Sequence, residues 1–130
     1  MRTLGFHHLA IFVQDLEQLA RFYSDVLGLS EIARHLRDDG TLRSIWLALP
    51  GGGFLALEER PDALAASPTR TRGMAVLALG VAAAERRWVA EELKRRGIAI
   101  VKQTRWTLYF DDPEGNHLAL SHYPDPQPER

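Results

Sequence analysis

The feature that most constrains the fold is a strand–helix–strand–strand–strand pattern that occurs twice along the chain. In each copy an apolar strand leads at once into an amphipathic helix, and the helix ends at a glycine, Gly28 or Gly97. These two glycines lie 69 positions apart. Because neither copy buries its apolar face alone, the duplication predicts two units that pack on each other.

The first copy opens with the apolar segment Phe6–Val13, where alternate side chains fall on opposite faces of a strand. One face carries Phe6, His8, Ala10 and Phe12. Because both faces are largely apolar, we predict an inner strand that is covered on both sides.

A helix follows, and the side chain of Asp15 is suited to cap its first turn. Three strands then follow, at 30–35, 42–49 and 54–59. In the second copy, strands are expected at 74–81, 98–102, 105–110 and 117–123, and a helix at 82–96. Trp88 is expected to pack on the sheet, whereas His35 is interpreted as a surface residue at a strand end.

The pattern predicts an α+β fold in which two tandem βαβββ repeats form a curved mixed sheet around a cavity, with the helices on the outer face. We expect a single domain over 1–124, with repeat one at 5–60, a linker at 61–72 and repeat two at 73–123. The tail, 125–130, is rich in proline and is expected to be disordered. The sequence does not decide on which face of the sheet the side chains of Trp46, Trp106 and Tyr109 lie.

Composition excludes several classes of function. The net charge of −1 gives no reason to expect a nucleic-acid partner. The absence of cysteine excludes disulfides, thiolate metal sites and thiol nucleophiles. No apolar run is long enough to span a membrane, and the N-terminus lacks a secretion signal, so a cytoplasmic protein with no membrane partner is expected.

Three stretches carry a resemblance to a known family. They are His8-Leu9-Ala10-Ile11-Phe12-Val13-Gln14-Asp15-Leu16, Arg21-Phe22-Tyr23-Ser24-Asp25-Val26-Leu27-Gly28-Leu29 and Tyr109-Phe110-Asp111-Asp112-Pro113-Glu114-Gly115-Asn116. Together with the repeat, they make the chain similar to the vicinal oxygen chelate superfamily, which includes glyoxalase I, extradiol dioxygenases and bleomycin-resistance proteins. No specific member is indicated.

The resemblance implies a divalent metal whose ligands lie on the first and last strand of each repeat. These positions fall on His8, Ala56, Val76 and Ala119, and only His8 matches the family's ligands. Because a catalytic zinc needs about three protein ligands, no metal site is expected, no cofactor is expected and a divalent metal is disfavoured.

A displaced metal among His8, Glu58 and His117 stays open as an alternative. It is disfavoured because two residues along a strand span roughly 6.7 Å, whereas a metal–nitrogen bond is about 2 Å long.

The favoured hypothesis is a small-molecule-binding protein of the glyoxalase/bleomycin-resistance type that binds or sequesters a largely apolar ligand. The expected ligand-binding residues are His8, Phe12, Phe54, Ala56, Glu58, Val76, His117 and Ala119. The alternative is an enzyme of lyase, isomerase or dioxygenase type that uses a displaced metal or uses His8 as a general base. The identity of the ligand stays open.

The resemblance also implies a homodimer, with or without exchange of repeats.

Overall fold

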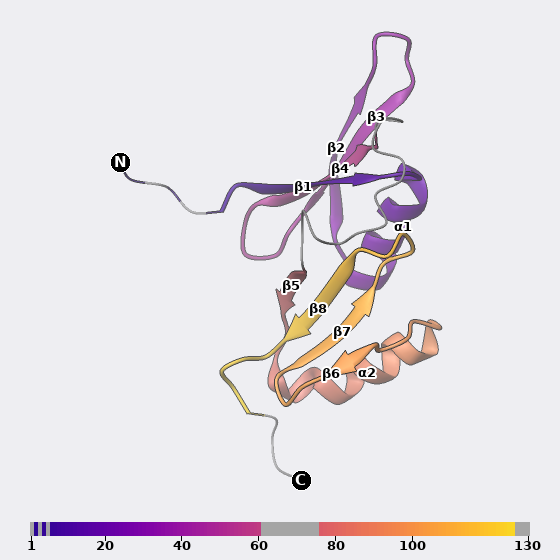
Figure 1. Cartoon of the computed structure of the whole chain (residues 1–130). Helices are drawn as coiled ribbons and strands as arrows, with labels where there is room; N and C mark the ends of the chain where they lie inside the picture. Colours follow the sequence, from indigo (N-terminus) through magenta and orange to yellow (C-terminus); the bar gives the residue numbers. More distant parts are fainter. Residues whose placement is uncertain (1, 3, 5, 61–75, 127–130) are drawn as a thin grey trace. The chain divides into compact units, whose positions relative to one another are not determined.

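The computed structural model of the chain describes residues 2, 4, 6–60 and 76–126. The chain divides into two compact units, Met1–Pro68 and Thr69–Arg130 (Figure 1). The predicted linker at 61–72 and the end of the predicted tail, 127–130, lie outside the described residues. Each unit is described by itself below.

Unit 1 has the predicted order of one strand, one helix and three strands. The elements are β1 (His8–Val13), α1 (Leu16–Leu27), β2 (Ser30–Leu36), β3 (Leu42–Ala48) and β4 (Phe54–Glu59). The strands form sheet A in the order β1-β4-β3-β2, with β1 parallel to β4 and the other pairs antiparallel. The predicted cap of α1 is confirmed, because the backbone N–H of Gln18 donates to Asp15 Oδ1 at 3.0 Å.

The apolar core of unit 1 lies between α1 and one face of sheet A, which we call the helix face. Its buried side chains come from alternate strand positions and from one side of α1. They are Ile11, Val13, Ile45, Leu47, Leu55 and Leu57 in the sheet, and Leu16, Leu19, Ala20 and Tyr23 in α1.

The opposite face of sheet A, which we call the ring face, carries the intervening side chains. They are His8, Ala10 and Phe12 of β1, Ala33 and His35 of β2, Ser44, Trp46 and Ala48 of β3, and Phe54, Ala56 and Glu58 of β4.

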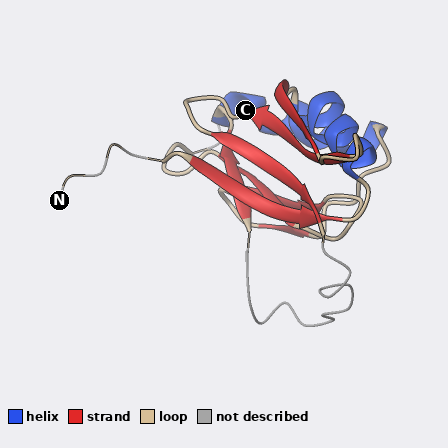
Figure 2. Cartoon of the chain, turned by 90° about the horizontal axis from the view of Figure 1, so that it is seen from above, coloured by secondary structure: helices blue, strands red, loops and turns tan. Residues whose placement is uncertain are grey.

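Unit 2 repeats this architecture. Figure 2 shows the strands of the chain in red and the helices in blue. Its elements are β5 (Leu77–Gly80), the short 3₁₀ helix η2 (Ala83–Glu85), α2 (Arg86–Arg95), β6 (Lys102–Gln103), β7 (Thr107–Asp111) and β8 (His117–Ser121). The strands form sheet B in the order β5-β8-β7-β6. The predicted α+β class with tandem βαβββ repeats is therefore confirmed, as two four-stranded mixed sheets that do not close into a barrel within the described ranges.

The predicted environment of β1 is wrong. In sheet A this strand lies at the edge, not inside the sheet. Ile11 and Val13 are buried on the helix face, whereas Phe12 is 54% exposed and His8 is also exposed. Largely apolar side chains on both faces predicted two covered faces, but α1 supplies cover for only one of them.

Two predictions for unit 2 are also wrong. Trp88 is 61% exposed and does not pack on the sheet. The buried residues of α2 are Val89 and Leu93, one helical turn apart, and Trp88 lies about 100° around the helix from Val89. The strand expected at 98–102 is reduced to Lys102–Gln103, because only these residues pair with β7 in a regular ladder.

None of the helices in the described part of the chain combines the length and the apolar character that crossing a bilayer requires.

The tight turn before β4 gives a first testable prediction. Gly53 has φ +76°, and a Cβ built there would lie 2.9 Å from the His7 carbonyl oxygen and 2.6 Å from the Phe6 ring. Gly40 has φ +87° but no neighbour within 4 Å of such a Cβ. Gly40→Ala should therefore cost about 1 kcal/mol of unfolding free energy, and Gly53→Ala about 1–3 kcal/mol more through overpacking.

Urea denaturation of both variants measures this difference. Equal losses of stability would show that the close approach of Gly53 to the His7 carbonyl contributes nothing.

Candidate functional site

A ladder of aromatic rings crosses the ring face of sheet A. His8 pairs in register with Phe54, and their rings stack with centroids 4.8 Å apart and an interplanar angle of 8°. Phe54 stacks in turn on Trp46 at 4.4 Å and 25°. His35 lies against the other side of this series, 4.3 Å from Trp46. We call these four side chains the ring ladder. Each strand of the sheet contributes one of them.

The histidine at the β1 end of the ladder has its own partner. His7 Nδ1 and His8 Nδ1 lie 2.8 Å apart, so one ring donates a proton to the other. His7 also meets Phe54 edge-on, with centroids 5.6 Å apart. These contacts fix the plane of His8 against Phe54 and leave its Nε2 atom for other interactions.

A row of polar side chains from β2, β3 and β4 lies beside the ladder, near the end of β4. Ser44 of β3 pairs with Glu58 of β4 on one side and with His35 of β2 on the other. Glu58 pairs with Phe12 of β1. The register therefore brings three polar groups, His35, Ser44 and Glu58, side by side on the same face as the rings.

Three buried polar atoms on this face have no hydrogen-bond partner in the described part of the chain. They are Ser44 Oγ, Trp46 Nε1 and His35 Nε2. Ser44 is fully buried. Buried polar atoms are normally hydrogen-bonded, and leaving one unpaired costs about 1–3 kcal/mol. All three atoms lie inside the packed side chains of this face, so they are unpaired within the fold and are not exposed to a ligand.

The residues at the family's metal positions do not fit a metal. Ala56 pairs with Trp46 in sheet A, and Ala119 pairs with Tyr109 in sheet B. Both alanines are only 2% exposed, and each lies beside an aromatic side chain on the neighbouring strand. Methyl groups have no lone pair to donate, and the same holds for the side chain of Val76.

The wider search for metal ligands gives the same picture. Across residues 6–60 and 76–126, no group of three or more His, Asp or Glu side chains could hold a metal ion. We therefore derive no chemistry through a metal.

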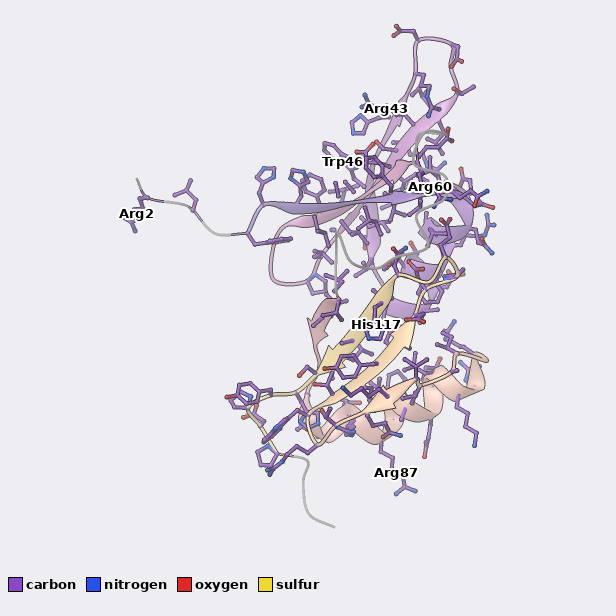
Figure 3. All side chains as sticks on the ribbon, in the orientation of Figure 1. Arg2, Arg43, Trp46, Arg60, Arg87 and His117 are labelled. Atoms are coloured by element: carbon purple, nitrogen blue, oxygen red, sulfur yellow. The ribbon has the colours of Figure 1, made fainter. Side chains whose placement is uncertain are left out.

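Sheet B carries a second polar arrangement, on β7 and β8. His117 Nδ1 lies 2.8 Å from Asp111 Oδ1, and these two residues pair in register. The ring of Tyr109 stacks on His117 with centroids 5.4 Å apart and an angle of 9°. Lys102 Nζ lies 5.6 Å from the centroid of the Tyr109 ring. The carboxylate and the stacked ring together fix the orientation of the His117 imidazole. His117 is labelled in Figure 3.

The structure divides the predicted ligand-binding residues between the two units. Sheet A holds His8, Phe12, Phe54, Ala56 and Glu58, all on the ring face. Sheet B holds His117 and Ala119 on one face of β8, and Val76 precedes β5 and is 39% exposed. A cavity that joins both sets stays a prediction, because the two sets belong to separate units.

The local sequence carries no signal for Ser44, and it predicts His35 as a surface residue. The structure places His35 half-buried against Trp46, which is a correction. No local signal identifies these residues, because their proximity to His8 and Phe54 depends on strand register. Strand alternation from Ala56 would have found Trp46 only with the pairing of β3 and β4 in hand.

Comparison with solved structures shows the same fold in several proteins. A glyoxalase/dioxygenase from Nostoc punctiforme is 22% identical, with a TM-score of 0.73 over 94% of this chain and 92% of that one. The fosfomycin resistance protein FosX from Listeria monocytogenes is 19% identical, with a TM-score of 0.73 over 93% and 92%. Lactoylglutathione lyase from Agrobacterium tumefaciens is 21% identical, with a TM-score of 0.70 over 95% and 96%.

One of the FosX structures is a complex with Mn(II) and a sulfate ion. At these levels of identity the likeness concerns the fold alone. By sequence, no curated protein matches the chain.

A comparison of the sequence with models of protein families identifies one family. The model of the glyoxalase/bleomycin resistance protein/dioxygenase superfamily matches residues 5–120, which is nearly all of both units. The matched range contains both repeats and the ring ladder. The chain therefore belongs to the glyoxalase/bleomycin resistance protein/dioxygenase superfamily.

Proposed function

We propose that this chain binds a small, largely apolar aromatic molecule on the ring face of sheet A, and that binding needs no metal. The observation that carries the proposal is the ring ladder, in which His8, Phe54, Trp46 and His35 lie in contact across the sheet. Aromatic side chains supply large apolar area and prefer stacked or edge-to-face partners, with about 0.5–1.5 kcal/mol for each such contact beyond the area buried.

The surroundings of the ladder support binding of this kind. Phe12 is 54% exposed on the same face, so its ring adds accessible apolar area beside the ladder. Glu58, half-buried on the same face, supplies a polar group that can orient a ligand in a mostly apolar site.

The experiment is a thermal-shift screen of the purified protein against neutral and charged aromatic molecules. A ligand at about 100 times its dissociation constant should stabilise the protein by about 2.7 kcal/mol. If no aromatic molecule raises the melting temperature, the proposal fails.

The composition of the metal positions gives a further prediction. Purified protein should carry less than stoichiometric Zn, Ni, Mn or Fe, because alanine and valine replace the ligands at three of the four family positions. Metal analysis by mass spectrometry of the protein, before and after dialysis against a chelator, measures this. One tightly held metal ion per chain would show that another set of ligands has replaced the family's set.

A second candidate function, an enzyme, is favoured by the Asp111–His117 pair. A carboxylate that accepts from Nδ1 leaves the Nε2 lone pair of His117 available as a general base. His8, the general base suggested by the sequence, is paired with another histidine, whereas His117 is paired with a carboxylate. The corresponding reaction class is abstraction of a proton next to a carbonyl group.

NMR in D₂O can follow this reaction as exchange of the α-protons of small carbonyl compounds. Exchange that depends on protein and is lost in His117→Gln would support the enzyme, and absence of exchange would exclude this reaction for the compounds tested.

Membership of the family also supports a homodimer. Size-exclusion chromatography with light scattering measures the oligomeric state, and a clear monomer at micromolar concentration would contradict the homodimer.

A further inference from the structure

A hollow of about 350 Å³ lies in unit 2, between α2 and the segment that follows this helix. Four of its six lining side chains are aliphatic and two are charged. They are Ala90, Glu91, Lys94, Ile98, Ala99 and Ile100. Sites for small molecules are typically concave and mostly apolar, with a few polar groups that orient the ligand. The hollow has this composition, and it shares no residue with the ring face of sheet A.

The turn that ends α2 forms one wall of the hollow. Gly97 has φ +74°, and its backbone N–H donates to the carbonyl of Lys94 at 3.0 Å. The N–H of Ile98 donates to the carbonyl of Leu93 at 2.9 Å. These are the two hydrogen bonds of the Schellman motif, which ends a helix and reverses the chain. The segment 98–100 therefore lines the same hollow as the last turns of α2.

The helix contributes a side that the core leaves uncovered. Val89 and Leu93 are the buried residues of α2, and Ala90 lies about 100° around the helix from Val89. Ala90, Ile98 and Ile100 are each half-buried. An aliphatic chain that lay in the hollow would remove their remaining apolar surface from water, which is favourable.

Lys94 gives the hollow a positive charge. The other charged residue of the lining, Glu91, is paired with Arg87 at 3.3 Å. Lys94 makes no ion pair with another residue in the part of the chain that the structure describes. A lysine stem can lie along an apolar surface while its ammonium group stays in water. An ammonium group at the margin of an apolar hollow suits a ligand that is apolar with an anionic end.

The next residues along α2 add to this charge. Arg95 Nε and Arg96 Nε both donate to the carboxylate of Glu92, at 3.0 and 2.8 Å. These hydrogen bonds lower the pKa of Glu92 to about 2, so its carboxylate stays ionised. Two cations on one anion leave an excess positive charge next to Lys94 in the chain, which favours an anionic ligand over a cationic one.

From these observations we infer that unit 2 has a ligand site of its own, which takes a small carboxylate with an unbranched apolar chain. The chain lies against Ala90, Ile98 and Ile100, and the carboxylate accepts a hydrogen bond from Lys94 Nζ. A ligand with so few non-hydrogen atoms should bind in the millimolar range.

The test uses three probes that share a six-carbon chain, each titrated into the full chain at pH 7 and followed by NMR chemical shifts. Hexanoate should shift the backbone amides of 90–100. It should bind about three- to fivefold more tightly than neutral 1-hexanol, which is the contribution of an exposed ion pair. Hexylammonium should bind more weakly than 1-hexanol.

Lys94→Met keeps an apolar stem without the charge, so it should remove the preference for hexanoate over 1-hexanol. Ala90→Leu fills the hollow and should weaken both probes. Lys102→Met is the matched control, because Lys102 is an exposed lysine of β6 outside the lining, and it should leave the affinities unchanged.

Hexanoate that shifts no amide of 90–100 would overturn the inference. So would equal binding of hexanoate and 1-hexanol, tighter binding of hexylammonium, or an unchanged preference in Lys94→Met. Each of these results would leave the proposed function standing, because the two sites have no residue in common.

Discussion

Replacing Trp46 with alanine should remove most of the affinity for aromatic ligands. Trp46 is one of the two inner rings of the ladder, in contact with Phe54 on one side and His35 on the other. Truncating a central aromatic contact commonly costs roughly 2–4 kcal/mol of binding free energy, which corresponds to about a 30- to 1,000-fold weaker dissociation constant. Calorimetry with the tightest ligand from the screen measures the change.

The chain offers a matched control in Trp88. This tryptophan is 61% exposed on α2 in unit 2, so Trp88→Ala should leave the affinity unchanged. Trp46→Phe keeps a ring in the ladder, so its affinity for the ligand should lie between those of wild type and Trp46→Ala. Wild-type affinity in a folded Trp46→Ala protein would show that the ligand binds elsewhere. Circular dichroism establishes that each variant is folded.

The second large effect concerns stability. Leu57 of β4 is fully buried, and it pairs in register with Ile11 on one side and Ile45 on the other. Leu57→Ala should lower the free energy of unfolding by roughly 2–5 kcal/mol, because it removes apolar contacts and leaves a cavity under α1. Urea denaturation followed by circular dichroism measures the loss.

Leu36 provides the comparison for this substitution. It lies in β2 of the same sheet but is 62% exposed, so Leu36→Ala should change the stability by no more than about 0.5 kcal/mol. If both variants lost the same stability, the core of unit 1 would not lie between α1 and the helix face of sheet A.

Several features were predictable because they depend on residues close together in the chain. The cap at Asp15 and the left-handed turn at Gly28 arise from contacts within one helical turn. The alternation of β1 put His8 and Phe12 on one face and Ile11 on the other, since successive strand side chains point in opposite directions. The absence of metal ligands at Ala56 and Ala119 is likewise visible in the residue types alone.

The errors in β1 and α2 have a different origin. An apolar strand is covered on both faces only when something packs on both, and in unit 1 the single helix covers one face. In α2 the side that faces the sheet is set by Val89 and Leu93, so the large side chain of Trp88 stays outside. Hydrophobicity identifies residues that can be buried, but the packing partner decides which of them are.

The local pattern of the chain thus specified the βαβββ repeats, the family and the face on which His8 lies. The composition of the ring face was decided only when distant strands paired. Ser44, Trp46 and His35 meet Glu58 and Phe54 through the registers of β2 with β3 and of β3 with β4. A shift of one residue in either register would place the alternate set of side chains on the ring face. That register depends on the summed packing of the helix face, which no short stretch of sequence contains.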